Sequence, residues 1–223
     1  MLATNNKFLG LLYLGPALLF VAVFVLYPLV QLISLSFTSE SLLGGGEYVG
    51  FENYVKAFND KNFWRAFWFT AQYTAYITPI LMIFAFMLAL LASVNRPLIQ
   101  LARGVIFLPV VIGLASSSLL WFWLFDQQVG LFNKLLVDIG ILDKPLVWFR
   151  KADLGQLAVV ISVTWKIVGF GMLLMIAGMQ SISGEIIEAA KIDGATYWQR
   201  VRRIILPLSM RSILLATLVS IIG

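Results

Sequence analysis

The chain has 223 residues, of which 61% are hydrophobic and 12% charged, and its net charge is +5. Such an apolar composition excludes an ordinary soluble domain and predicts an integral membrane protein. The absence of cysteine and histidine excludes disulfides, thiolate clusters and His-based zinc sites. The basic residues are scattered among apolar stretches rather than gathered with stacking aromatics, so nucleic-acid binding is not expected.

The first part of the chain predicts two membrane spans separated by a polar loop. Residues 8–35 form an apolar run long enough to cross the ~30 Å hydrocarbon layer at about 1.5 Å per residue. A cleaved signal peptide is the alternative, although the run exceeds the usual apolar core of ~7–15 residues. Within loop 38–62, residues 51–58 predict an amphipathic helix that lies at the membrane interface. Residues 63–92 form the second span, with a kink expected at Pro79.

The second part predicts two further spans and the start of a fifth. Residues 104–125 form the third span, which contains Pro109 and a run of small residues that permits close helix packing. A long polar loop, 126–153, leads to the fourth span at 154–179. Residues 212–223 begin a fifth span but reach only about 18 Å at 1.5 Å per residue. We therefore expect the chain to be incomplete at its C-terminal end.

The distribution of basic residues predicts the orientation. Loop 93–103 contains Arg96 and Arg103 and no acidic residue, and segment 180–211 has an excess of basic residues, whereas loop 38–62 is net negative. Because cytoplasmic loops carry the excess of Lys and Arg, the N-terminus and segment 180–211 are predicted to be cytoplasmic.

The segment between the fourth and fifth spans, residues 185–207, predicts two short helices joined at a glycine; we call it the elbow. Ser181 and Ser183 offer N-caps for the first helix, and Gly194 breaks it. Thr196 caps the second helix, which Pro207 interrupts. Alanines in the first helix leave a surface with little side-chain bulk, which suits docking into a partner better than building a core.

The elbow also contains a recognisable pattern. EAA at 188–190 is followed two residues later by DGA at 193–195, and I-x-LP ends at Pro207. This pattern resembles the EAA loop of permease subunits of bacterial ATP-binding-cassette importers. Further stretches resemble the carbohydrate-uptake branch of that family, which moves maltose-like sugars and glycerol phosphate: FENYVKAF at 51–58, WLFD at 123–126, GLFN at 130–133, and WKIVGFGMLL with AGMQSI between Trp165 and Ile182. The chain departs from the usual pattern at Val201, Ser183 and Gln127.

The resemblance implies a fold and a setting. The fold is an all-α polytopic transmembrane helix bundle like that of a type I ABC importer permease, with one permease domain over 1–223 and a cytoplasmic coupling loop at 181–207. The rest of the fifth span and a sixth are missing from it. The implied location is the bacterial cytoplasmic (inner) membrane, with several passes. The implied partners are two ATP-binding subunits, a second and different permease subunit, and an extracytoplasmic solute-binding protein.

The resemblance assigns ATPase coupling to six elbow residues: Glu188, Ala189, Ala190, Asp193, Gly194 and Ala195. The alternative is an amphipathic cytoplasmic linker without a partner. Because helices this short are marginal in water without tertiary support, a docking partner is the better interpretation.

No catalytic role is expected for the chain. It contains no P-loop sequence, so ATP and Mg²⁺ are expected on partner subunits, and no cofactor or metal site is predicted here. An ion-coupled secondary transporter is one alternative, but the predicted spans contain no Asp or Glu to take a coupling ion. A structural membrane subunit is another, and it leaves the elbow unexplained.

Candidates for the translocation pathway are polar residues inside the spans. Lys166 lies near mid-membrane, where a lysine costs about 2.5–3.5 kcal/mol unless it faces protein or water, so it should point inward. It either lines the pathway or forms a helix–helix hydrogen bond with a partner subunit. The further candidates, with helix packing as the alternative, are Gln72, Thr74, Thr78, Ser116, Ser117, Ser118, Ser162 and Thr164. Tryptophans could stack on sugar rings or anchor the interface: Trp64, Trp68, Trp121 and Trp123.

Overall fold

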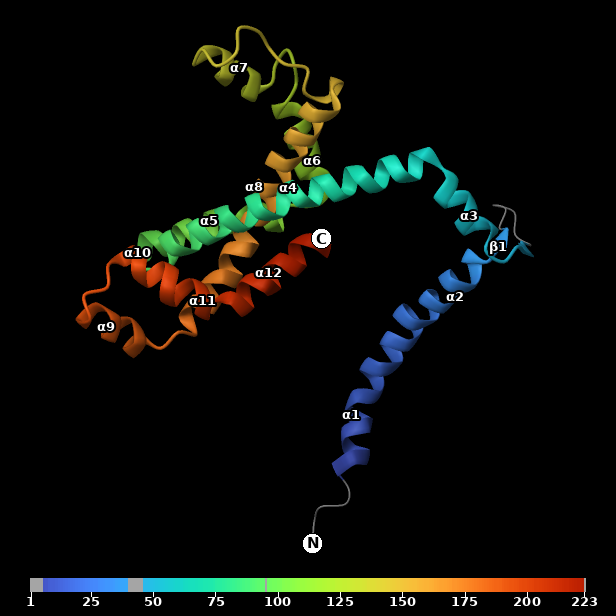
Figure 1. Ribbon diagram of the computed structural model, residues 1–223, viewed down its shortest axis with the longest axis horizontal. Coiled ribbons are helices and arrows are strands. Elements are labelled where there is room, and N and C mark those ends of the chain that lie inside the picture. The colour runs from blue at the N-terminus through green and yellow to red at the C-terminus, as the bar shows by residue number, and fades with distance from the viewer. Residues whose placement is uncertain (1–5, 40–45, 95, 223) are drawn as a thin grey trace. The chain divides into compact units, whose positions relative to one another are not determined.

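The computed structural model describes residues 6–39, 46–94 and 96–222, with side chains from Tyr13 onward, and these residues are mostly helical (Figure 1). The chain divides into two units, residues 1–69 and 70–223, and the boundary falls inside helix α4 (Lys61–Ala92). Each unit is described by itself.

The first unit contains a long apolar helical segment, a short hairpin and a surface helix. Its elements are α1 (Asn6–Val21), the π-helical turn η1 (Ala22–Leu26), α2 (Tyr27–Ser36), strands β1 (Thr38–Ser39) and β2 (Glu47–Tyr48), α3 (Glu52–Asn59) and the start of α4. The strands pair antiparallel, with Thr38 opposite Tyr48. Helix α3 covers most of the amphipathic helix predicted at 51–58.

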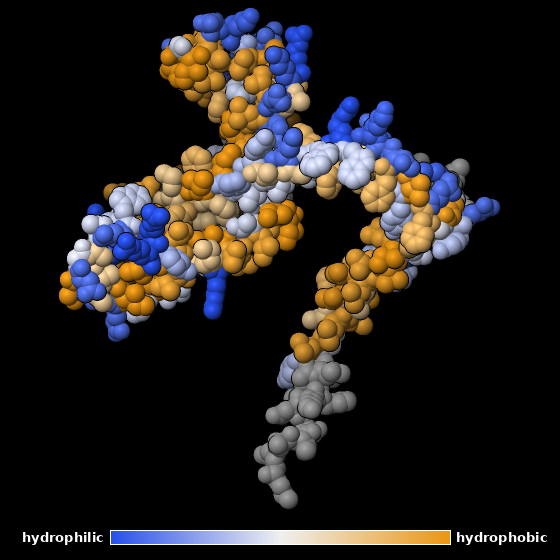
Figure 2. Space-filling model, in the orientation of Figure 1, coloured by the Kyte–Doolittle hydropathy of each residue, from blue (hydrophilic) through white to orange (hydrophobic). Residues whose placement is uncertain are grey.

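Residues Tyr13–Ser36 form one of three helical stretches in the described chain that are long and apolar enough to cross a membrane. None of its side chains is buried within the chain, and hydrophobic residues cover it from end to end (Figure 2). The π-helical turn precedes Pro28: the Tyr27 N–H donates to the Ala22 carbonyl, five residues back. The proline ring clashes with the carbonyl four residues before it, and the wider turn accommodates that clash.

Helix α3 is fixed to the end of α2 by polar contacts. The Asn53 side-chain amide donates to the Ser36 carbonyl at 3.0 Å and to the Thr38 carbonyl at 2.8 Å. The Tyr54 and Ser36 hydroxyls lie 2.7 Å apart. The ring of Phe37 packs edge-on against Phe51, with centroids 5.4 Å apart. These contacts hold α3 against the end of the long helix.

The second unit is built around α8 (Ala152–Gln180), the longest helix that lies wholly within it. Its other elements are the rest of α4, α5 (Pro97–Val111), α6 (Leu114–Leu124), α7 (Leu131–Asp138), the 3₁₀ turn η2 (Trp148–Arg150), α9 (Gly184–Ile192), α10 (Tyr197–Arg200), the π-helical turn η3 (Val201–Ile205), α11 (Leu206–Leu208) and α12 (Met210–Ile222). Helices α5 and α12 pack against α8. Hydrophilic residues gather over α9–α10 and over the tip that carries α7 (Figure 2).

Small residues let α4, α8 and α12 approach closely. Ala85, Ala89 and Ala92 recur along one face of α4 and pack with methionines of α8 and with Ala216 of α12. At the α8–α12 contact, a Cβ on Gly178 would lie 2.3 Å from the hydroxyl oxygen of Ser212. The two helices therefore touch where each meets the elbow.

The predicted third span at 104–125 differs in the structure. Helices α5 and α6 divide the stretch at Ile112–Gly113 and make an angle of 99°. The predicted connection 93–103 is also partly wrong, because α5 begins at Pro97 and includes Arg103. Helices α10–α11 and α12 form a second bent pair, at 67°, where the fifth span was predicted at 212–223. The other predicted spans, 8–35, 63–92 and 154–179, lie within helices as the structure has them.

A buried asparagine organises the loop between α6 and α8. The Asn133 side-chain amide donates to the carbonyls of Asp126 (3.1 Å) and Leu146 (2.9 Å), and its oxygen accepts from the Leu146 N–H (3.0 Å) and the Trp148 indole (3.2 Å). The Asp126 carboxylate accepts the backbone N–H of Gln128 and Val129. The Val129 bond, followed by the Gln128 bond, lowers the pKa of Asp126.

Candidate functional site

The first half of the elbow is a capped helix, as predicted. Helix α9 begins after Ser183, whose hydroxyl accepts the backbone N–H of Glu185 at 3.3 Å. It ends at Ile192, and Gly194, two residues further on, has a φ of +75°. The Gly194 N–H donates to the Lys191 carbonyl and the Ala195 N–H to the Ala190 carbonyl. This is a Schellman motif, which needs a left-handed residue where glycine has no steric cost.

The second half of the elbow begins with a capping box. The Thr196 N–H donates to the Gln199 side-chain oxygen at 2.7 Å, and the Thr196 hydroxyl accepts the Gln199 N–H. The Arg200 guanidinium donates to the Ala195 carbonyl. The connection from Gly194 to Thr196 is therefore held on both sides and gives the elbow a defined shape.

The elbow returns to the helix bundle through a widened turn. The Leu206 N–H donates to the Val201 carbonyl, five residues back, and Pro207 follows. This is the arrangement seen before Pro28. Val201 is buried and anchors this part of the elbow. The predicted interruption at Pro207 takes the form of a wider helical turn followed by a bend into α12.

The predicted coupling residues are presented on the outside of the elbow. Glu188, Ala189, Asp193 and Gly194 are exposed, and Ala190 and Ala195 are half-buried. Ile192 is 87% exposed, an unusual position for a large apolar side chain outside the spans. Among the described residues the single ion pair is Lys56–Glu52, so the carboxylates of the elbow have no cationic partner there. A hollow of about 320 Å³ beside the elbow is lined by Asp193, Gly194, Ala195, Gln199, Arg203 and Ile204.

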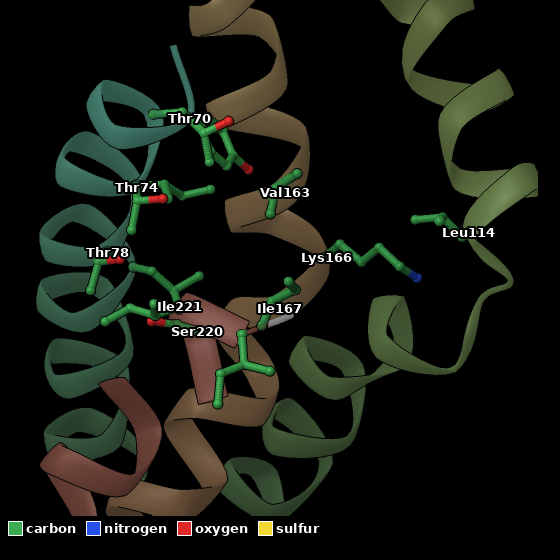
Figure 3. A pocket seen from close by; sticks show the side chains of 13 residues that line it. Thr70, Thr74, Thr78, Leu114, Val163, Lys166, Ile167, Ser220 and Ile221 are labelled. Carbon is green, nitrogen blue, oxygen red and sulfur yellow. The ribbon is translucent and has the colours of Figure 1, made fainter. Parts of the chain in front are cut away.

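A cavity of about 410 Å³ lies among α4, α8 and α12. Its wall on α4 is a stripe at helical spacing that begins at Thr70 and ends at Leu81. Threonine side chains of α4 line one side of the cavity, and the end of α12, including Ser220, lines another (Figure 3). The hydroxyl of Thr78 is buried and has no hydrogen-bond partner among the described residues. The cavity combines an apolar wall with a few hydroxyl groups, as ligand sites commonly do.

Lys166 lies at the edge of this cavity and points away from the threonine row, toward the break between α5 and α6 (Figure 3). Its Nζ donates to the Ile112 carbonyl at 2.6 Å and to the Pro109 carbonyl at 3.3 Å. These carbonyls belong to the last turn of α5, whose C-terminal carbonyls lack helical partners and carry partial negative charge. One turn further along α8, a Cβ on Gly169 would lie 2.4 Å from the Ile106 carbonyl oxygen. Lys166 and Gly169 together hold α5 against α8.

Arg103 makes the same kind of contact at the end of α4. Its Nε donates to the Ala92 carbonyl at 2.7 Å and its Nη2 to the Val94 carbonyl at 3.2 Å. Each cation thus caps the C-terminal carbonyls of one helix from a position on another: Arg103 of α5 caps α4, and Lys166 of α8 caps α5. Lys166 points inward, as its depth in the span predicts. Its hydrogen-bond acceptors, however, belong to this chain and not to a partner subunit.

The other pathway candidates are placed differently from one another. Ser117 is buried beside Lys166 in a small adjoining cavity of about 50 Å³, and its hydroxyl donates to the carbonyls of Gly113 and Leu114. The Thr164 hydroxyl is buried without a partner among the described residues and does not line either cavity. Gln72 is exposed and lies off the α4 stripe. Sequence reasoning missed Thr70 and Tyr73, although helical spacing from Thr74 and Thr78 points to them.

Residues 9–223 match the family described as the binding-protein-dependent transport system inner membrane component. The chain belongs to this family.

Within the described residues, no group of acidic side chains could hold a metal ion.

Similar proteins include two bacterial permeases. The chain is 34% identical to the lactose transport system permease protein of Rhizobium radiobacter, over 96% of this chain and 72% of that protein. It is 32% identical to the sulfoquinovosyl glycerol transport system permease protein of Agrobacterium fabrum, over 95% of this chain and 69% of that protein. The structure of a bacterial alginate ABC transporter, in complex with an alginate pentasaccharide-bound periplasmic protein, contains a chain of the same fold. Its TM-score is 0.82 at 23% identity, covering 96% of this chain and 72% of that one.

The permease family membership confirms several predictions. The chain has the predicted all-α polytopic fold of an ABC importer permease and is a multi-pass inner membrane protein. It is a transport subunit rather than an enzyme, since ATP hydrolysis belongs to the partner ATPase subunits of such importers.

Proposed function

We propose that this permease carries a carbohydrate-like solute into the cytoplasm and that the elbow couples the transport to ATP hydrolysis. Curated relatives named for lactose and sulfoquinovosyl glycerol transport support the carbohydrate. The cavity bordered by threonine hydroxyls is the observation in this chain that carries it. Hydroxyl groups on an apolar wall suit a neutral, polyhydroxylated solute, which offers both hydrogen-bonding groups and C–H surface.

The coupling proposal rests on how the elbow is connected. Helix α9 follows α8 after three residues, and α10–α11 lead directly into α12. Helices α8 and α12 touch at Gly178 and Ser212, so a force on the elbow reaches both. Helix α8 also carries Lys166, which holds the end of α5. Movement of the elbow would therefore shift cavity walls together, as coupling to a two-state element requires.

The exposed face of α9 is the proposed contact with an ATP-binding subunit. Glu188 offers a carboxylate that has no ion-pair partner in the part of the chain that the structure describes, Ala189 a flat surface, and Ile192 an apolar side chain for a groove in the partner. The proposed assembly contains two ATP-binding subunits, a second permease subunit and an external solute-binding protein. ATP and Mg²⁺ are bound by the ATP-binding subunits.

The proposed orientation places the elbow and the N-terminus in the cytoplasm. It rests on the excess of arginine in residues 93–103, which include the first turns of α5, and in the elbow. A reporter that is active only outside the cytoplasm should give signal when fused at Asp138 and none when fused at Arg200. The reverse pattern would contradict both the orientation and the docking of ATPase subunits on the elbow.

The solute is identified by purifying the full transporter with its loaded binding protein and analysing the released small molecule by mass spectrometry. We expect a sugar, a glycoside or a polyol derivative. Release of an amino acid, a peptide or a metal chelate, with uptake of the same compound by the reconstituted transporter, would refute the carbohydrate proposal.

A further inference from the structure

Beyond the cavity of Figure 3 and the small cavity beside Lys166, a third hollow lies along α8, toward the end of this helix that is farther from the elbow. Its volume is about 320 Å³, and it shares four residues with the small cavity beside Lys166: Ser118, Trp121, Ser162 and Val163. That small cavity in turn shares Leu114, Val163 and Lys166 with the cavity of Figure 3. The three hollows thus follow one face of α8 from Ile167 to Ala158, about 14 Å at 1.5 Å per residue.

The walls of the third hollow are aromatic. Phe122 and Phe149 stack with ring centroids 5.8 Å apart and an interplanar angle of 20°, and they are 64% and 51% exposed. Behind them Trp121 is buried against Phe125, with centroids 5.3 Å apart. The burial of Trp121 means that it is not an interfacial anchor. Its indole N–H has no hydrogen-bond partner among the described residues.

The polar groups of the hollow are neutral. The Ser118 hydroxyl donates to the Leu114 carbonyl at 2.8 Å and the Ser162 hydroxyl to the Val159 carbonyl at 3.0 Å. Each hydroxyl proton is thus used within its own helix, and the oxygen lone pairs remain as acceptors. None of the residues that line the hollow is ionisable. The wall offers hydrogen-bond acceptors and aromatic surface but no charge.

We propose that this hollow is an entry subsite for a neutral sugar ring. A pyranose presents C–H groups on its faces and hydroxyl donors at its rim; the faces fit aromatic rings, and the rim fits the serine oxygens. A phosphate ester or an acidic sugar would lose hydration here without meeting a cation, since the ammonium of Lys166 is directed to the carbonyls of α5. The inference rests on the carbohydrate function proposed above and narrows it to uncharged rings.

The test is saturation-transfer NMR on the full transporter in nanodiscs, without binding protein or ATP, using three probes: lactose, methyl α-glucoside and glycerol 3-phosphate. We expect saturation of ring C–H protons for at least one neutral probe and none for glycerol 3-phosphate. Phe149→Ala should reduce the signal at least fivefold, and Phe149→Tyr should retain it because the ring remains. Phe84→Ala is the matched control, since Phe84 is 52% exposed and lines none of the three hollows.

Several outcomes overturn the inference. Equal signals in the Phe149→Ala and Phe84→Ala variants would do so, and so would loss of signal in Phe149→Tyr, a preference for glycerol 3-phosphate, or no saturation of any probe. Uptake by the reconstituted transporter separates this failure from failure of the carbohydrate function. If the wild type imports a sugar while the NMR result is negative, the entry subsite is wrong and the function stands. If the wild type imports no carbohydrate, both are wrong.

Discussion

Replacing Lys166 by methionine tests whether this lysine fixes the bend between α5 and α6. The variant keeps a side chain of similar length but removes the donors to the Ile112 and Pro109 carbonyls. Two hydrogen bonds from a charged group contribute about 3–6 kcal/mol. Replacing a lysine at mid-membrane also removes its insertion cost of about 2.5–3.5 kcal/mol. The net change in stability therefore lies between a gain of about 0.5 kcal/mol and a loss of about 3.5 kcal/mol, small enough for the protein to insert and fold.

The effect on geometry should be larger than the effect on stability. Because the chain has no cysteine, spin labels can be placed on introduced cysteines at Val105 in α5 and Leu120 in α6, both exposed. We expect a broader distance distribution between the labels in Lys166→Met than in wild type, together with slower solute uptake. Lys166→Arg should be intermediate, since it keeps a cation but not the shape of the ammonium. Lys134→Met in α7 is the control.

Unchanged distance distributions and normal uptake in Lys166→Met would refute the reasoning. The lysine would then be a side chain that only reaches for the nearest polar groups, and the bend would be set by the backbone at Gly113 and Pro109.

Three further changes follow from the structure. Gly178→Ala places a methyl group against Ser212 and should cost about 1–3 kcal/mol in thermal unfolding, whereas Gly104→Ala, which has open space, should not. Asn133→Ala removes four hydrogen bonds of the 126–148 loop and should raise its hydrogen exchange. Because folding lowers the pKa of Asp126, its carboxylate stabilises the protein fully above the unfolded pKa of about 3.9, and this stabilisation is lost as the pH falls through the folded pKa. The unfolding temperature of the Asp126→Asn variant should therefore depend less on pH below about 4 than that of the wild type.

Local features were predicted well from the sequence because they depend on neighbouring residues. The caps at Ser183 and Thr196 and the left-handed Gly194 follow from rules of helix termination. The pattern around Glu188 indicates the permease family, to which residues 9–223 belong. The interruption at Pro207 was predicted, but its π-helical form was not, and neither was the similar turn before Pro28.

Features that depend on distant residues were not predicted. The apolar run 104–125 contains Pro109 and Gly113, but its sequence does not predict a 99° bend. The carbonyl of Ile112 at the bend accepts from Lys166, which lies 54 residues further along the chain. Asn133 is one polar residue in a polar loop, and its burial follows from the packing of Trp148 and its neighbours. Gln72 was chosen for polarity alone. The helical stripe through Thr74 and Thr78 was a usable signal that places Gln72 on another face.

The most direct test of the central claim is the response of ATPase retention to a change at Gly194. At a φ of +75° a valine costs about 1–2 kcal/mol, and no neighbouring atom within 4 Å would meet its Cβ. Gly140→Val is the matched control, because Gly140 has a φ of +76° and equally open space. We predict that Gly194→Val gives a membrane-inserted permease of normal abundance that loses its ATPase subunits on purification or loses solute-stimulated ATP hydrolysis, and that Gly140→Val retains both. Normal ATPase retention and stimulation in Gly194→Val would show that the elbow is an ordinary linker.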